Sequence, residues 1–347
     1  MNLLAKGFIT INLIAGPLLT MSSNHWIMAW CGLEISTLSI IPLIAQQHHP
    51  RAIEASTKYF LTQAAASSMV LFSTILSSWD LGQWDVTLTH NNISCTLLTI
   101  ALAMKLGLAP FHLWLPEVLQ GSTTMTALLL TTWQKLAPLT LLMMTFQHLN
   151  TSMLLLMGLM STLIGGWGGL NQTQLRKIMA FSSIAHLGWM IAVITMSPKL
   201  ALLTFYLYST MTSAMFLMMN HLKTNTMATV MTSWTKTPSM NAMMMMTLMS
   251  LGGLPPLTGF SPKWLILQEL TKQHLSIIAT LMALASLLSL FFYLRVSYYT
   301  TITLPPNSYN YAQQWRHKMY NVKPHLALTS SLSTMLLPLL PTMLFAI

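Results

Sequence analysis

Long stretches of predominantly apolar residues follow one another along almost the whole chain. A helix of about 20 apolar residues is what crosses the hydrocarbon core of a bilayer. Only 6% of the 347 residues are charged, against about 25% in an ordinary soluble domain. The sequence therefore predicts a single all-α, polytopic membrane domain over residues 1–347. We count eleven segments: 2–21, 24–45, 52–78, 94–120, 124–147, 151–171, 174–195, 199–221, 239–272, 275–300 and 325–345.

Basic residues between the segments predict the orientation, because lysines and arginines are retained in loops on the inner side of a membrane. In an eleven-span chain, only Lys199 and Lys272 fall on the side opposite the N-terminus. We therefore expect the N-terminus to face the positive-inside compartment. This topology accounts for the net charge of +10, so we expect no nucleic-acid partner. The residues on the N-terminal side are Arg51, Arg176, Lys177, Lys223, Lys236, Arg316, Lys318 and Lys323.

Glycines and prolines interrupt two segments, the fourth and the ninth. A proline inside a helix has no N–H and leaves the carbonyl four residues earlier unpaired. In hydrocarbon this backbone must be covered by protein or water. Both segments should therefore be broken helices, with free carbonyls at Leu106, Leu251 and Gly252. The interrupting residues are Gly107, Pro110 and Pro116 in the fourth segment, and Gly252, Gly253, Pro255, Pro256, Gly259 and Pro262 in the ninth.

The spacing of the two interruptions predicts an inverted repeat. They lie five spans apart, and five is odd, so two five-helix units in tandem would enter the membrane from opposite sides. We expect the units to be 1–147 and 151–300, followed by a C-terminal helix at 325–345. Secondary transporters place their substrate sites at such interrupted helices, near the middle of the membrane.

Charged residues near the middle of apolar segments are Glu34, Lys105, Lys135 and Lys263. Each costs about 3 kcal/mol at that depth, which indicates ion or proton handling. A static ion pair that fixes helix packing is the alternative role for Glu34. Of the four carboxylates in the segments, all but Glu34 lie close to segment ends, so salt bridges cannot neutralise all three lysines and we expect some to be hydrated or uncharged. The carboxylates in the segments are Glu34, Glu54, Glu117 and Glu269.

Lys58 and His112 are further candidates for proton transfer, each with an open alternative. Lys58 would form a switch if it paired with Glu34, but Glu54 is four residues earlier and favours a local pair. His112 follows the first interruption and titrates in a range that suits a relay between Lys105 and Lys135. A buried histidine with satisfied hydrogen bonds is equally open.

The two interrupted segments resemble the broken helices of the antiporter-like subunits of respiratory complex I. The residues that carry the resemblance are Ala103–His112 with Leu115–Glu117, Leu251–Phe260 with Lys263, Gly32–Glu34 and Lys58–Leu61. Antiporter-like subunits usually have fourteen spans, so we expect this chain to lack the first three. The 30 methionines and the threonine-rich spans are similar to vertebrate mitochondrial members, and we expect a mammalian source.

The resemblance implies proton translocation across the mitochondrial inner membrane, with the N-terminus in the matrix. NADH oxidation and ubiquinone reduction would occur in other subunits. The partners would be other membrane-arm subunits of the complex and membrane lipids, not further copies of this chain. A free-standing cation/proton antiporter and a purely structural subunit are the alternatives.

No cofactor or metal is expected in this chain. Its two cysteines, Cys31 and Cys95, cannot ligate an iron–sulfur cluster or frame a disulfide scaffold. The glycines at 165, 166, 168 and 169 lie inside an apolar segment and follow no predicted strand, so they do not indicate a dinucleotide site. Gly165 and Gly169 have the spacing that lets two membrane helices approach closely.

Overall fold

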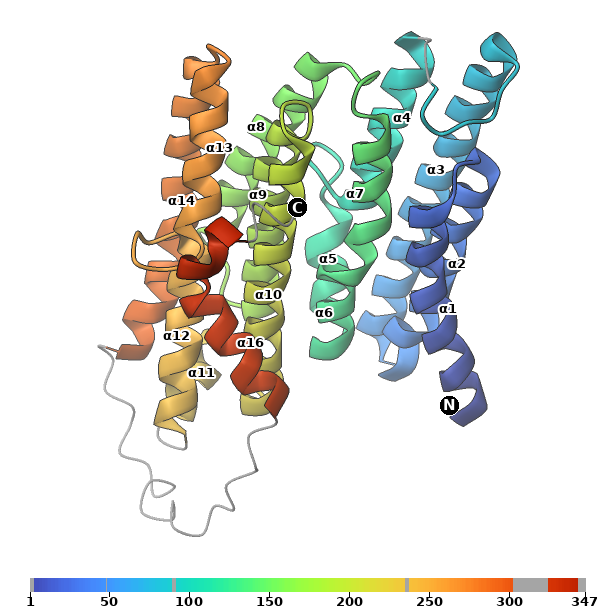
Figure 1. The fold of residues 1–347 in the computed structure, drawn as a ribbon. Helices are drawn as coiled ribbons and strands as arrows, with labels where there is room; N and C mark the ends of the chain where they lie inside the picture. The colour runs from blue at the N-terminus through green and yellow to red at the C-terminus, as the bar shows by residue number, and fades with distance from the viewer. Residues whose placement is uncertain (1–2, 48, 89–91, 235–236, 302–323, 343–347) are drawn as a thin grey trace. The chain divides into compact units, whose positions relative to one another are not determined.

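The structure of the chain is a computed structural model that describes residues 3–47, 49–88, 92–234, 237–301 and 324–342 (Figure 1). Over these ranges the chain is helical and contains no β-strand. It divides into two compact units. One comprises Met1–Ser161 with Ile194–Pro198, and the other comprises Thr162–Val193 with Lys199–Ile347.

The first unit begins with two helices that pack at very short distance, α1 and α2. A Cβ atom on Gly16 of α1 would lie 2.8 Å from the carbonyl oxygen of Gly32 in α2. Small residues at such a crossing let two membrane helices approach backbone to backbone. The elements of this part are α1 (Leu3–Ser22), α2 (Trp26–Ile44), η1 (Ala45–Gln47), α3 (Pro50–Leu81), α4 (Asn92–Leu106), α5 (Trp114–Gly121), α6 (Thr124–Thr131) and α7 (Trp133–Thr145).

α8 (Thr151–Gly169) carries the glycine cluster, and in the second unit these glycines contact two helices. A Cβ atom on Gly165 would lie 2.7 Å from the backbone nitrogen of Ala185 in α9, whereas one on Gly169 would meet the ring of Phe292 in α14. The remaining elements are α9 (Leu175–Ile194), α10 (Pro198–Leu222), α11 (Met227–Ser233), α12 (Pro238–Gly252), α13 (Phe260–Lys272), α14 (Ser276–Thr301), α16 (Pro324–Met335) and η3 (Leu337–Leu339).

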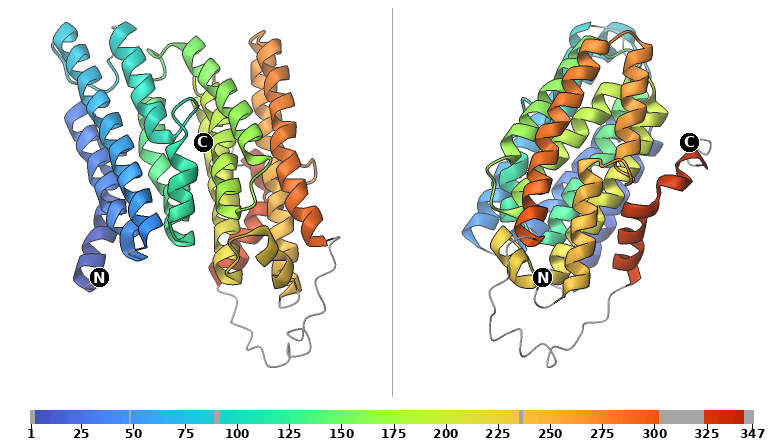
Figure 2. Two further views of the ribbon diagram at one scale, coloured as in Figure 1. Left: turned by 180° about the vertical axis from the view of Figure 1, so that it is seen from behind. Right: turned by 90° about the vertical axis from the view of Figure 1, so that its left-hand side faces the viewer.

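All eleven apolar segments contain helix over their described residues (Figure 2). Within the described part of the chain, eight helical stretches are long and apolar enough to cross a membrane. The other three are the fourth and ninth segments, which glycine and proline interrupt, and the C-terminal segment. The predicted end of the C-terminal segment, beyond residue 342, lies outside the described residues. The predicted all-α membrane fold is therefore confirmed. The predicted orientation rests partly on four basic residues that also lie outside the described residues: Lys236, Arg316, Lys318 and Lys323.

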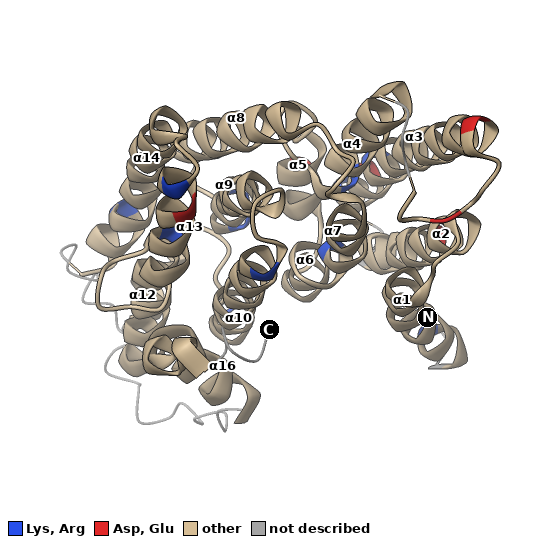
Figure 3. Cartoon of the chain, turned by 45° about the horizontal axis from the view of Figure 1, so that its top comes forward, with Lys and Arg blue, Asp and Glu red and all other residues tan. Residues whose placement is uncertain are grey.

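The outward faces of the membrane helices carry large apolar side chains. Leu4 and Phe8 of α1 are 87% and 67% exposed, and Ile277 of α14 is 75% exposed. Charged residues are sparse along the helices (Figure 3). Surfaces of this kind suit hydrocarbon, which takes up apolar side chains but not unpaired charges.

Candidate functional site

The first interruption ends α4 in a Schellman motif. The Gly107 N–H donates to the carbonyls of Ala103 and Met104, and the Leu108 N–H donates to Ala103 at 3.0 Å. Gly107 has φ of +78°, which glycine adopts without the strain a side chain would add. The Trp114 indole N–H then reaches back from α5 to the Met104 carbonyl at 3.1 Å. The predicted broken helix is confirmed, with Lys105 in its last turn.

The second interruption repeats this backbone arrangement. Gly253, with φ of +81°, follows α12, and its N–H donates to the carbonyls of Met249 and Ser250, while the Leu254 N–H donates to Met249. The Lys263 ammonium reaches back from α13 and donates to the Gly252 carbonyl at 2.8 Å. This is one of the carbonyls that the prolines were predicted to leave free. A cation at this place also complements the negative end of the α12 dipole.

A third break, which we did not predict, lies beside Lys135. α6 ends at Thr131 and α7 begins at Trp133, and Thr132 between them has φ of −113° and ψ of −68°. The Thr132 hydroxyl donates to the Leu128 carbonyl at 2.7 Å. Pro138 lies inside α7 and frees the Gln134 carbonyl, which is past the break, so no glycine or proline in the sequence marks the break itself. Each of the three central lysines therefore lies close to a helix end.

Lys105 and Lys135 line the same small cavity in the first unit. Their side chains are buried, at 7% and 3% exposed, and the Lys105 ammonium has no hydrogen-bond partner in the described structure. The cavity has a volume of about 20 Å³, room for roughly one water molecule. Its polar lining, besides the lysines, consists of Ser36, Thr37, Tyr59, Gln63, Trp114 and Gln134. The cavity therefore offers polar side chains to a water molecule.

Glu34 lines a second small cavity next to the first. The two cavities share Thr37, Tyr59 and Gln63 in their walls. The Thr37 hydroxyl donates to the Glu34 carboxylate at 3.2 Å, and the carboxylate interacts electrostatically with Lys105. The sequence-predicted residues Glu34, Lys105 and Lys135 are thus brought together from α2, α4 and α7.

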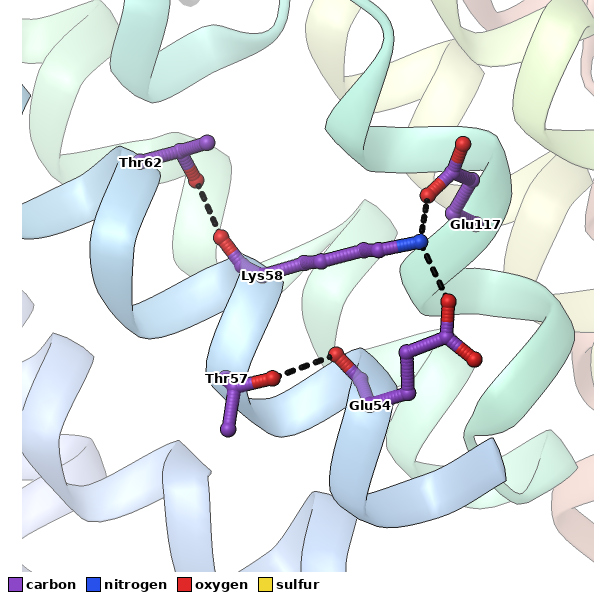
Figure 4. A network of polar contacts seen from close by, with 5 residues as sticks. All are labelled: Glu54, Thr57, Lys58, Thr62 and Glu117. Atoms are coloured by element: carbon purple, nitrogen blue, oxygen red, sulfur yellow. Dashed lines mark hydrogen bonds and ion pairs between the residues drawn. The ribbon is translucent and has the colours of Figure 1, made fainter. Parts of the chain in front are cut away.

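Lys58 lies apart from these cavities, in an ion cluster on the surface of the first unit (Figure 4). Its ammonium donates to Glu54, four residues earlier in α3, and to Glu117 of α5, each at 2.5 Å. The side chains of Lys58, Glu54 and Glu117 are 40%, 61% and 52% exposed. The local pair is therefore confirmed as the correct alternative. The pairing of Lys58 with Glu34 is wrong, because α5 brings a second carboxylate, Glu117, to the lysine. A role of Lys58 in proton transfer stays a prediction.

His112 lies in the connection between α4 and α5 and is buried, at 9% exposed. It is not among the residues that line the cavity of Lys105 and Lys135. Since the two lysines already share a cavity, a relay through His112 is not required between them, and its role stays a prediction. Lys263 belongs to the second unit, so a continuous chain of proton-exchanging lysines is likewise still a prediction.

Comparison with protein families matches residues 23–289 to the family described as NADH:quinone oxidoreductase/Mrp antiporter, TM. Residues 290–344 match the NADH dehydrogenase subunit 2 C-terminus.

Relatives match over nearly their full length. NADH-ubiquinone oxidoreductase chain 2 of Pelomedusa subrufa is 63% identical, with 99% of both chains covered. The chain of the same name from Gallus gallus is 59% identical, with 98% of both covered. These relatives do not support the mammalian source that we expected.

Solved structures share the fold at low identity. A chain of respiratory complex I from Thermus thermophilus superposes with a TM-score of 0.82 at 24% identity, covering 95% of this chain and 78% of that one. A chain of the Mrp complex from Dietzia sp. DQ12-45-1b gives a TM-score of 0.79 at 15% identity, covering 97% and 76%. The chain therefore belongs to the NADH:quinone oxidoreductase/Mrp antiporter family of membrane proteins and, within it, to the NADH-ubiquinone oxidoreductase chain 2 family.

Proposed function

We propose that this chain translocates protons as a membrane subunit of respiratory complex I, driven by NADH oxidation and ubiquinone reduction in other subunits. The observation that carries the proposal is the cavity shared by Lys105 and Lys135, with Glu34 in the cavity beside it. Family membership supplies the link to redox chemistry. The cavities supply titratable groups that are shielded from lipid and close to one another.

The geometry supports a stepwise transfer. A carboxylate and an ammonium about 6 Å apart attract each other by roughly 2.8 kcal/mol at an effective dielectric of 20. While Glu34 is ionised, it therefore favours the protonated form of Lys105. Neutralising or moving the Glu34 carboxylate would let Lys105 give up its proton. A water molecule in the shared cavity would then accept the proton from Lys105 and pass one to Lys135. The buried position of both lysines keeps this exchange from leaking to either surface.

The setting that goes with this function is the mitochondrial inner membrane, with the N-terminus in the matrix. The partners would be other membrane-arm subunits and lipids, and the chain would act without a cofactor or metal of its own and not as a homo-oligomer. The proposal gives the three lysines and Glu34 proton-transfer roles. It gives Lys58 a structural role in the surface ion cluster.

The test is Lys105→Met in the assembled complex, compared with Lys199→Met. Lys199 is exposed at the start of α10, so its replacement controls for the loss of a lysine at a span end. We expect fewer protons pumped per electron in Lys105→Met only, with quinone reduction falling alongside because the two are coupled. Equal pumping in both variants would contradict the proposal and favour a structural subunit. Na⁺ or K⁺ exchange for protons by the chain reconstituted alone would favour a free-standing antiporter.

A further inference from the structure

A groove of about 890 Å³ lies in the second unit, between α12, α14 and the segment that follows α8. Its walls are mainly apolar, and α12 and α14 supply most of them. The groove also contains one cation, Arg295, and the described lining residues include no carboxylate. The apolar side chains that the argument uses are Met246, Met249, Phe291 and Leu294.

Arg295 is held in place by two contacts that leave part of its guanidinium free. It donates one hydrogen bond to the Leu170 carbonyl, just past the C-terminal end of α8. Its guanidinium carbon lies 5.8 Å from the centre of the Tyr299 ring. A guanidinium carries five N–H donors in a fixed fork, and among the described residues only the Leu170 carbonyl accepts from it, so further donors remain for an acceptor from outside the chain. The arginine is thus oriented by the described residues and not saturated by them.

The depth of Arg295 along α14 suits a lipid phosphate. The helix ends at Thr301, six residues later, or about 9 Å along the axis. Tyr298 and Tyr299 lie between them and are 58% and 37% exposed. Tyrosines concentrate at the level of lipid headgroups, and an arginine one turn deeper extends its side chain toward that level. The apolar wall at Phe291 and Leu294 continues from there toward the membrane interior.

We propose that this groove binds one anionic phospholipid, with its phosphate on Arg295 and an acyl chain along Met246, Met249 and Phe291. The ligand must combine negative charge with a long apolar portion, because the groove offers one unsaturated cation at the end of an apolar trench and no opposing carboxylate. Basic pockets between membrane helices are where anionic lipid headgroups bind. The site is separate from the lysine cavity, which lies in the other unit.

The test uses the assembled complex in nanodiscs of phosphatidylcholine with a photoactivatable phosphatidylglycerol, followed by mapping of labelled peptides. We expect labelling of α12 and α14 in the wild type. Arg295→Gln should lower it about fivefold, the effect of one arginine beside an anionic surface, whereas Arg295→Lys should keep most of it. Lys199→Gln is the control, because Lys199 does not line the groove, and it should change nothing.

Two further measurements keep the proposal open to refutation. Met246→Trp fills the apolar trench without removing the arginine, so it should lower labelling even if Arg295→Gln fails to assemble. A photoactivatable phosphatidylcholine should label the groove weakly and without dependence on Arg295. Equal labelling by both lipids, or labelling that neither variant changes, would overturn the proposal. So would crosslinks from groove residues to a neighbouring subunit in place of lipid.

Discussion

Replacing Lys105 and Lys263 by methionine, one at a time, should affect stability differently although the chemical change is the same. Each replacement relieves about 3 kcal/mol of cost for a charge at mid-membrane depth. In Lys105→Met the offsetting loss is the attraction to Glu34, roughly 2.8 kcal/mol for charges about 6 Å apart at an effective dielectric of 20, because the ammonium has no hydrogen-bond partner in the described structure. The net change should be near zero.

Lys263→Met loses more. It removes the charged hydrogen bond to the Gly252 carbonyl and so leaves that carbonyl unpaired, which costs about 2–7 kcal/mol for a buried polar group in an apolar environment. It also removes a cation from the C-terminal end of α12, worth about 0.3–1 kcal/mol. Taking the middle of these ranges and subtracting the relief of about 3 kcal/mol leaves Lys263→Met destabilised by about 2 kcal/mol.

The assay heats the assembled complex and measures, on native gels, the temperature at which half of it is lost. It is applied to the wild type, both variants and Lys199→Met. A large complex does not unfold in a two-state manner, so the order of the variants is the readout and not a free energy. We expect Lys263→Met to be lost first, and Lys105→Met to match the wild type and the control. The reasoning is refuted if Lys105→Met is the less stable of the two.

Three further predictions follow from the same contacts. Glu34→Gln should lower the protons pumped per electron and leave assembly intact, and normal pumping would rule out its control of Lys105. Lys58→Met should change pumping far less than Glu34→Gln does, since its ion cluster is exposed; an equal loss would return Lys58 to the proton path. Gly253→Ala should lower thermal stability by roughly 1–2 kcal/mol, the cost of a left-handed backbone for a residue with a side chain, and should displace the ammonium that lies 3.0 Å from its added Cβ. Gly252→Ala is its control, because the added Cβ meets nothing closer than 3.6 Å, and equal thermal stability and equal pumping in the two variants would count against this account.

The partner of Lys58 illustrates where sequence reasoning reaches its limit. A carboxylate four residues away on the same helix is visible in the sequence, because helix geometry fixes its distance, and Glu54 was correctly weighed as a partner. Glu117 is 59 residues away, and only the packing of α5 against α3 brings it to the same ammonium. The pairing with Glu34 failed for the same reason, since nothing in a sequence fixes which face of α2 meets α3.

The three helix breaks divide in a similar way. Two breaks could be predicted from Gly107 and Gly253 and the prolines that follow them. Glycine allows backbone conformations that end a helix, and proline lacks the N–H that a helix needs. The break at Thr132 was not predicted, because threonine is tolerated in helices and no glycine or proline stands at the break itself. The direct contact from Lys263 to the Gly252 carbonyl was also hidden, although the carbonyl itself was identified as free.

The sequence by itself determined the membrane setting, the eleven helical segments, the two marked interruptions and the identity of the buried charged residues. Each of these follows from local chemistry: apolar length, missing N–H groups, and the cost of charge in hydrocarbon. The tertiary structure alone decided that Lys105 and Lys135 share a cavity, that Glu34 lines the neighbouring cavity, and that Arg295 lines an apolar groove. These facts depend on how helix faces are rotated against one another. In a membrane, lipid-facing and protein-facing surfaces have similar composition, so the sequence does not show that rotation.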